Sequence, residues 1–176
     1  VGSEMCIRDR LENVTISNGI AWSPDGALAY YNDTPSHEVV VFDWFPEAGL
    51  QNRRSFVRPV VDDDAAAAAT DPGEQYEPGS VTANPDGLTV DSEGAVWTAL
   101  NGSGQVHRYL PDGTLDTVVS VGAKQVTACT LGGEDLRTLY ITTSRENLPA
   151  DVQPTAGSLY SVRVAVPGQV TRAFAG

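Results

Sequence analysis

The chain has 176 residues, enough for one ordinary domain, and 41% of them are hydrophobic, which is typical of a globular protein. Eleven Lys and Arg stand against twenty-three Asp and Glu, a formal net charge of −12, and without clustered basic residues this composition excludes a nucleic-acid partner. No apolar run reaches the roughly 18 residues that a membrane-spanning helix needs, so we expect no membrane partner either.

The first ten residues, VGSEMCIRDR, differ in character from the rest of the chain. They begin without an initiator methionine, show neither strand nor helix periodicity, and lack the apolar core of a signal peptide. They are similar to the adaptor-derived leaders that recur at the ends of metagenomic reading frames. We therefore expect residues 1–10 to be a non-native leader, and the natural N-terminus with any targeting signal to be missing.

Cys6 and Cys129 are the two cysteines of the chain, and they have no zinc-finger spacing. Because Cys6 falls in the leader, we expect no disulfide between them. Cys129 stands in the apolar run 126–131, where a small buried hydrophobic residue is the ordinary interpretation. The scarcity of cysteine is consistent with a bacterial cytoplasm, which is the compartment we expect, although the composition leaves other compartments open.

The most informative feature is an internal repeat. Residues 18–31 read NGIAWSPDGALAYY, and residues 86–99 read DGLTVDSEGAVWTA. In both copies a polar residue and a glycine precede a short apolar run, and an acidic residue followed by glycine separates this run from a second one. Such turns between two β-rich runs predict hairpins.

Each repeat continues into a second hairpin, and a third, looser copy begins at Val126. The pattern indicates four short strands per unit with a period near 40 residues, without helical periodicity, as in the blades of a β-propeller. The further strands that we predict cover residues 39–44, 52–57, 104–110, 115–121, 139–143 and 157–164.

The sequence thus predicts an all-β fold with three propeller blades at about residues 11–61, 85–122 and 126–176. Propellers have about four to eight blades, and three blades leave open strand edges. We therefore expect the chain to be a fragment of a longer propeller. Residues 62–84, with a run of three Asp followed by a run of five Ala, break the rhythm and are expected to form a solvated loop, the alternative being a lid over the channel.

Several motifs after Leu11 occur in the order found in one family. Residues 16–26 (ISNGIAWSPDG), 52–54 (NRR), 85–91 (PDGLTVD) and 129–133 (CTLGG) resemble the last three blades of the regucalcin/gluconolactonase family. The end of the chain is similar to the family's C-terminus. The resemblance implies a six-bladed propeller, of which this chain is the C-terminal half, with one divalent cation in its central channel.

The resemblance also implies that Asn18 and Asp86 are metal ligands. On spacing alone, Asn-Gly and Pro-Asp-Gly are ordinary turn sequences. The two residues nevertheless occupy the same position in successive blades, just before the innermost strand, and equivalent positions of a propeller converge on its axis. Their oxygens suit hard cations, so we expect Ca²⁺ first, with Zn²⁺, Mg²⁺ or Mn²⁺ as alternatives.

The chemistry implied by the family is hydrolysis of a sugar lactone, a small cyclic ester. A bound cation polarises the lactone carbonyl, and a carboxylate beside it accepts a proton from the attacking water. Asp86 is our candidate for this catalytic base as well as for a ligand. No organic cofactor is implied.

The sequence departs from the family where its other functional residues would stand. The family's third ligand is a Glu of the first blade, and its substrate-orienting Arg and Asn lie in the middle blades, which are not represented here. We therefore expect the chain by itself to be poorly stable and inactive. A related esterase or organophosphate hydrolase and a non-enzymatic calcium-binding or interaction propeller remain alternative functions of the parent protein.

The remaining polar residues of interest are expected to be mainly structural. Three acidic residues stand in hairpin turns beside glycine, and two histidines lie apart from any nucleophilic serine motif. Three more residues follow the second strands of the first two blades, where they could reach a channel mouth. These residues are Asp25, Glu93 and Asp112; His37 and His107; and Asn32, Asp33 and Asn101.

Overall fold

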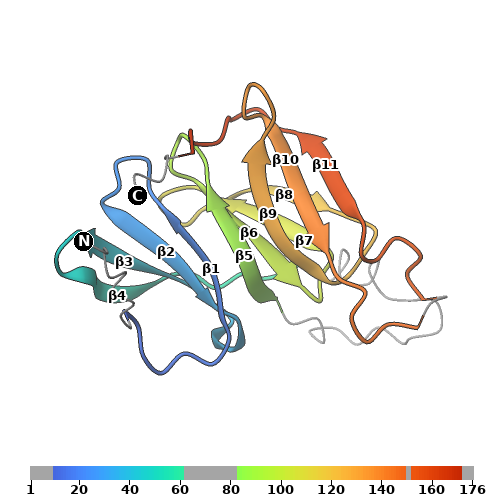
Figure 1. The fold of residues 1–176 in the computed structure, drawn as a ribbon, viewed down its shortest axis with the longest axis horizontal. Helices are drawn as coiled ribbons and strands as arrows, with labels where there is room; N and C mark the ends of the chain where they lie inside the picture. Colours follow the sequence, from blue (N-terminus) through green and yellow to red (C-terminus); the bar gives the residue numbers. More distant parts are fainter. Residues whose placement is uncertain (1–9, 62–82, 150–151, 172–176) are drawn as a thin grey trace, which may run out of the picture.

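A computed structural model describes residues 10–61, 83–149 and 152–171, which form three antiparallel sheets (Figure 1). The first sheet contains β1 (Ser17–Trp22), β2 (Leu28–Asp33), β3 (Val39–Phe45) and β4 (Gly49–Val57). The second contains β5 (Asn84–Val90), β6 (Val96–Asn101), β7 (Gln105–Tyr109) and β8 (Leu115–Ser120). The third contains β9 (Val126–Gly132), β10 (Thr138–Thr143) and β11 (Leu159–Arg163). A short 3₁₀ helix, η1 (Thr34–Ser36), follows β2, and the described ranges contain no helix able to span a membrane.

The all-β prediction is confirmed, and in each sheet the strands pair in chain order as antiparallel neighbours. The first two sheets have the four strands expected for each repeat, whereas the third has three within the described ranges. One boundary is corrected: Asn84, which we placed in the long loop, is the first residue of β5 because it pairs with Asn101. Ala83, also placed in that loop, is buried, and residues 62–82 lie outside the described residues.

The first strands of the three sheets, β1, β5 and β9, lie side by side (Figure 1). Glycines make this arrangement possible. A Cβ atom added to Gly19 would lie 2.5 Å from the backbone nitrogen of Leu88, and one added to Gly87 would lie 2.5 Å from the Cβ of Ala128. The innermost strands therefore touch through their backbones, as they do around a propeller axis.

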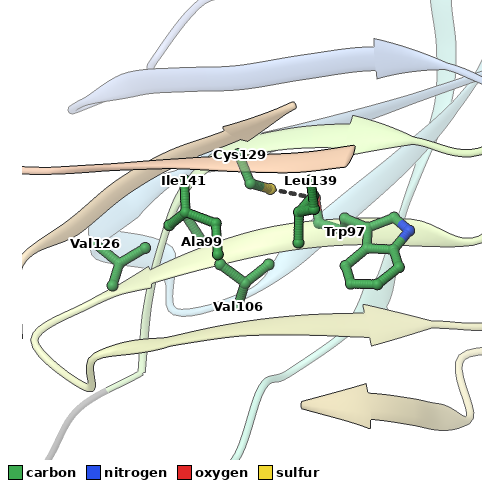
Figure 2. Packing of buried hydrophobic residues seen from close by; sticks show 7 residues of the cluster. All are labelled: Trp97, Ala99, Val106, Val126, Cys129, Leu139 and Ile141. Carbon is green, nitrogen blue, oxygen red and sulfur yellow. Dashed lines mark hydrogen bonds between the residues drawn. The ribbon is translucent and has the colours of Figure 1, made fainter. Parts of the chain in front are cut away.

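Apolar side chains fill the spaces between the sheets. Between the second and third sheets, Figure 2 shows Trp97, Ala99 and Val106 meeting four residues of β9 and β10: Val126, Cys129, Leu139 and Ile141. Between the first and second sheets the buried cluster contains Tyr30, Val39, Val41, Leu88, Val90 and Val96. Burial of this kind, at about 25 cal/mol per Å² of apolar surface, is the main driving force for packing the sheets.

Cys129 is confirmed as a buried free thiol. Its Sγ donates a 3.5 Å hydrogen bond to the Trp97 carbonyl oxygen, and burial raises its pKa to about 12 (Figure 2). A thiol with so high a pKa is neutral at physiological pH and unreactive. Cys6 lies outside the described residues.

The third strand of the first sheet is buried on both faces, because consecutive side chains of a strand point in opposite directions. Val39 and Val41 face the second sheet, whereas Val40 and Phe42 pack with Tyr31 in a cluster that has Leu11, Val14 and Leu50 at its margin. The continuous apolar run in this strand therefore reflects a sheet that is covered on both sides.

A buried ion pair holds the first turn of the second sheet. Asp91 is fully buried, and its carboxylate accepts hydrogen bonds from Arg108 Nε at 2.8 Å and Trp97 Nε1 at 3.0 Å. The other carboxylate oxygen accepts the backbone N–H groups of Glu93 and Ala95, both at 3.0 Å. A buried carboxylate with this many donors has its charge and its lone pairs satisfied.

The segment after β11 crosses the ends of the first strands. Gln169 Nε2 donates to the carbonyl oxygens of Trp22 at 2.9 Å and Val90 at 3.1 Å, and so joins the first sheet to the second. Gly168 forms an isolated β-bridge with Asp91. A residue late in the chain thereby ties together strands that are far apart in sequence.

His107 is buried in β7 and is neutral in the fold. Its Nε2 donates to Gln105 Oε1 at 2.7 Å, an oxygen that can only accept, and its Nδ1 therefore accepts from the Tyr109 hydroxyl at 2.9 Å. Burial lowers the pKa of His107 from 6.5 to about 4. The prediction of a packing role for this residue is confirmed.

We expect His107 to make folding sensitive to mild acid. Between pH 6.5 and 4 the unfolded chain binds a proton that the folded chain excludes, so the free energy of unfolding decreases by up to about 3 kcal/mol. Urea titrations at a series of pH values should show this loss in the wild type and less of it in H107Q. H37Q, at an exposed histidine, is the control and should keep the wild-type dependence. Equal pH dependence in the wild type and H107Q would contradict the assignment.

Candidate cation site

The two candidate ligands lie in equivalent β-bulges. In the first sheet Ser17 pairs with Asp33, but the next pair on β1 is Ile20 with Tyr31, which leaves one extra residue on β1. The extra length falls on Asn18 and Gly19. A bulge interrupts the alternation of a strand and redirects a side chain, and bulges are common beside functional sites.

The second sheet repeats this irregularity at the matching position. Pro85 pairs with Leu100, and the next pair is Leu88 with Thr98, so that the extra residue falls on Asp86 and Gly87. In the third sheet the pairing passes from Val126–Thr143 to Ala128–Thr142 and leaves Thr127 as the extra residue. All three innermost strands therefore carry one bulge at the same level, and a polar side chain stands at each.

The half-buried carboxylate of Asp86 is surrounded by neutral donors. Asn101 Nδ2 donates to Asp86 Oδ2 at 3.2 Å, and Asn101 ends β6, where it pairs with Asn84, two residues before Asp86. Burial raises the pKa of Asp86 above its ordinary value, and hydrogen bonds from Asn101, Asn18 and the Gly87 backbone oppose this rise in part. The structure thus brings Asn18 and Asp86 together, as the repeat predicted.

Asn18 is connected to the second sheet by a hydroxyl group as well. Its Nδ2 donates to Thr34 Oγ1 at 3.2 Å, and Thr34 Oγ1 donates in turn to the Pro85 carbonyl oxygen at 2.9 Å. The pairs Ser17–Asp33 and Pro85–Leu100 are equivalent, so Thr34 and Asn101, the residues that follow, occupy matching positions in the two sheets.

The sequence-based prediction assigned a structural role to some of these residues and did not identify others. Asn32 and Asn101 were expected to be mainly structural, yet Asn101 binds the Asp86 carboxylate and Asn32 Nδ2 donates to the Asp86 carbonyl oxygen at 2.7 Å. Thr34 and Thr127 were not singled out. The register of the repeat, applied to the end of the second strand of each blade, would have identified Thr34 as the residue equivalent to Asn101.

The carboxylates of the other acidic candidates bind partners outside this cluster. The Asp33 carboxylate accepts the Thr15 and Ile16 backbone N–H groups, and Asp25 and Asp112 each accept a backbone N–H within their own turn. Glu93 forms an ion pair with Arg108. These carboxylates are structural, as expected.

The donors at this site fit a hard divalent cation in chemical type. A carboxylate and an amide supply the oxygen ligands that Ca²⁺, Mg²⁺ and Mn²⁺ prefer. Within the described ranges no three His, Cys, Asp or Glu residues come close enough to hold a metal by themselves. Since Ca²⁺ takes six to eight oxygens, Asn18 and Asp86 can form only part of a coordination shell.

Meandering antiparallel sheets that pack face to face along their innermost strands define the class of β-propeller proteins. Residues 3–145 match the model of the family described as SMP-30/Gluconolactonase/LRE-like region, and the chain belongs to this family. The resemblance drawn from the sequence motifs is thereby confirmed.

Three relatives illustrate the relationship. The chain is 37% identical over 167 residues to 6-deoxy-6-sulfogluconolactonase of Pseudomonas putida, 33% over 169 residues to L-arabinolactonase of Azospirillum brasilense, and 30% over 176 residues to rabbit (Oryctolagus cuniculus) regucalcin. The alignments cover 93%, 94% and 97% of this chain but 51%, 49% and 52% of the relatives. The chain therefore spans about half the length of these relatives.

The chain also spans about half the length of a similar protein of known structure. The calcium-binding protein regucalcin of Agrobacterium tumefaciens superimposes with a TM-score of 0.71 at 26% identity, over 89% of this chain and 48% of that protein. The three sheets described here thus correspond to about half of a regucalcin fold.

We expect Gly87→Ala to disturb the contact between β5 and β9. The added methyl group would lie 2.5 Å from the Ala128 Cβ, and such overpacking costs about 1–3 kcal/mol. Urea denaturation should show the lower stability. Gly122→Ala is the matched control, since its methyl group would find its nearest neighbour, the Thr155 hydroxyl, at 3.3 Å. If G87A unfolds at the wild-type urea concentration, the close approach of the strands is wrong.

Proposed function

We propose that this chain contributes half of the cation site of a sugar-lactone hydrolase, with Asn18 and Asp86 as two of the protein ligands. The observation that carries the proposal is the position of these residues, which occupy the same bulge in adjacent sheets, with Asn18 among the groups that lower the pKa of the Asp86 carboxyl group. Membership of the family and the names of two lactonase relatives support a lactone as the substrate.

The proposed architecture of the whole protein is a six-bladed propeller. The chain would supply blades at about residues 11–61, 85–122 and 126–176, and its length relative to its relatives supports this division. The remaining ligands and the groups that orient the substrate would come from the other three blades. The proposed partner is a small-molecule lactone, and the proposed metal is one divalent cation, with Ca²⁺ favoured by the likeness to a calcium-binding regucalcin.

The bound cation would act as a Lewis acid that polarises the lactone carbonyl. Asp86 would accept a proton from the water that attacks the carbonyl carbon, and the elevated pKa of its carboxyl group makes it a stronger base than an exposed aspartate. Asn101 holds Asp86 Oδ2 and so fixes the plane of the carboxylate. Asn18 would contribute its amide oxygen as a neutral ligand.

Calcium binding without catalysis is the second candidate function, and the regucalcin likeness favours it. The two functions use the same metal ligands, so metal binding does not separate them. They differ in whether the complete protein hydrolyses a lactone. Metal-dependent hydrolysis of gluconolactone, compared with that of a phosphotriester, separates a lactonase from a related hydrolase and from a calcium-binding protein.

We expect Asp86→Asn to abolish site-specific cation binding. Mn²⁺ added to the ¹⁵N-labelled chain should broaden the backbone amide signals of Gly19 and Gly87 first, because they adjoin the two ligands. D86N should remove this selective broadening, since the carboxylate is the one charged ligand proposed.

Asp112→Asn provides the matched control for this experiment. Asp112 belongs to another Pro-Asp-Gly sequence but lies in an exposed turn, where its carboxylate accepts the Thr114 backbone N–H at 2.9 Å. In D112N, Mn²⁺ should therefore broaden the Gly19 and Gly87 amide signals as it does in the wild type. This control matters because a chain with a net charge of −12 also attracts cations at other places. Equal Mn²⁺ broadening in wild type and D86N would overturn the proposal.

We also expect the 176-residue chain alone to be inactive toward gluconolactone. The proposed site has two protein ligands and no described group that orients a sugar, so the rate with Ca²⁺ or Mn²⁺ should equal that of buffer in a pH-indicator assay. Hydrolysis that disappears on addition of EDTA would show instead that the chain holds a complete site.

A further inference from the structure

Asn32 is a polar residue buried completely between the first and second sheets. Its Nδ2 donates two hydrogen bonds, to the Asp86 carbonyl oxygen at 2.7 Å and to Thr98 Oγ1 at 3.1 Å. Its Oδ1 is buried and receives no hydrogen bond within the described part of the chain. The unpaired oxygen is unfavourable, so the contribution of an asparagine at this position lies in the two hydrogen bonds that its Nδ2 donates.

The bond from Asn32 holds one of the two peptide groups that flank the Asp86 Cα. A bulge places carbonyl groups outside the regular ladder of the sheet, and they then need other donors. Asn32 supplies a donor to the peptide that follows Asp86. This contact restrains rotation about the Asp86 Cα–C bond.

Thr34 holds the other flanking peptide. Its hydroxyl donates to the Pro85 carbonyl oxygen at 2.9 Å, which restrains the peptide that precedes Asp86. The same hydroxyl accepts Asn18 Nδ2 at 3.2 Å. Side chains from the end of the first sheet thus fix both backbone torsions of Asp86, and one of them also contacts the second candidate ligand.

We propose that Asn32 and Thr34 are positioning residues that clamp the Asp86 bulge from the neighbouring sheet and thereby set the affinity of the site for a divalent cation. The inference rests on the proposed role of Asp86 as a ligand. Groups that orient ligands in this way typically change metal affinity by about 10–100-fold when they are removed.

The test compares Thr34→Val with Thr34→Ser and Asn32→Leu with Thr98→Val. T34V and N32L remove the donors to the flanking carbonyls, whereas T34S keeps the hydroxyl and T98V removes only the second partner of Asn32. Mn²⁺ affinity is measured from the broadening of the Gly87 amide signal. We expect T34V and N32L to bind Mn²⁺ about 10–100-fold more weakly, and T34S and T98V to bind like the wild type.

A second measurement, made without metal, reports the backbone itself. The ¹³Cα and ¹³C′ shifts of Asp86 depend on its torsions, so they should change in T34V and N32L but not in T34S and T98V. The T34V and T34S pair decides the matter if N32L fails to fold. Folded T34V with wild-type Mn²⁺ affinity, or with unchanged Asp86 shifts, would overturn the inference. If instead the wild type binds Mn²⁺ no better than D86N, the proposed function fails, while the Asp86 shifts still decide whether the clamp exists.

Discussion

The structure depends on the direct contact between the innermost strands. Gly19 and Gly87 leave no room for a side chain, and the backbones of β1, β5 and β9 approach until they touch. This approach brings the sheets close enough for the apolar faces between them to interlock. It also brings the bulges of adjacent sheets to the same place. Packing and site geometry therefore arise from one steric constraint.

The carboxylates of Asp91 and Asp86 have opposite environments. Asp91 is fully buried and is neutralised by Arg108, so its charge serves to hold a turn. Asp86 is half-buried, and it receives hydrogen bonds from neutral amides of Asn18, Asn101 and Gly87. Neutral donors stabilise a carboxylate less than a guanidinium does, which agrees with the proposed role of Asp86 as a cation ligand. This difference separates a structural carboxylate from a candidate ligand.

Much of the fold could be predicted from sequence because acidic-glycine turns and alternating apolar residues recur at a fixed period. The same repeat placed Asn18 and Asp86 in equivalent positions, and the structure brings them together. The clamp formed by Asn32 and Thr34 could not be predicted, because a side chain that donates to a distant carbonyl leaves no pattern in the sequence. The ion pair between Arg108 and Asp91 could not be predicted for a similar reason, since the guanidinium on β7 reaches past β6 to the residue that follows β5.

The hydrogen bonds of Gln169 form late in folding, after the strands that they join have been made. Its contact with Trp22 joins residues 147 positions apart. Contacts this distant in sequence close slowly, because the entropy of a large loop is lost before the contact forms. On the ribosome, β1 would emerge long before the residue that ties its end to β5. The edges of the early sheets would therefore stay accessible during synthesis, and pairing with other chains would compete with folding until the last strands arrive.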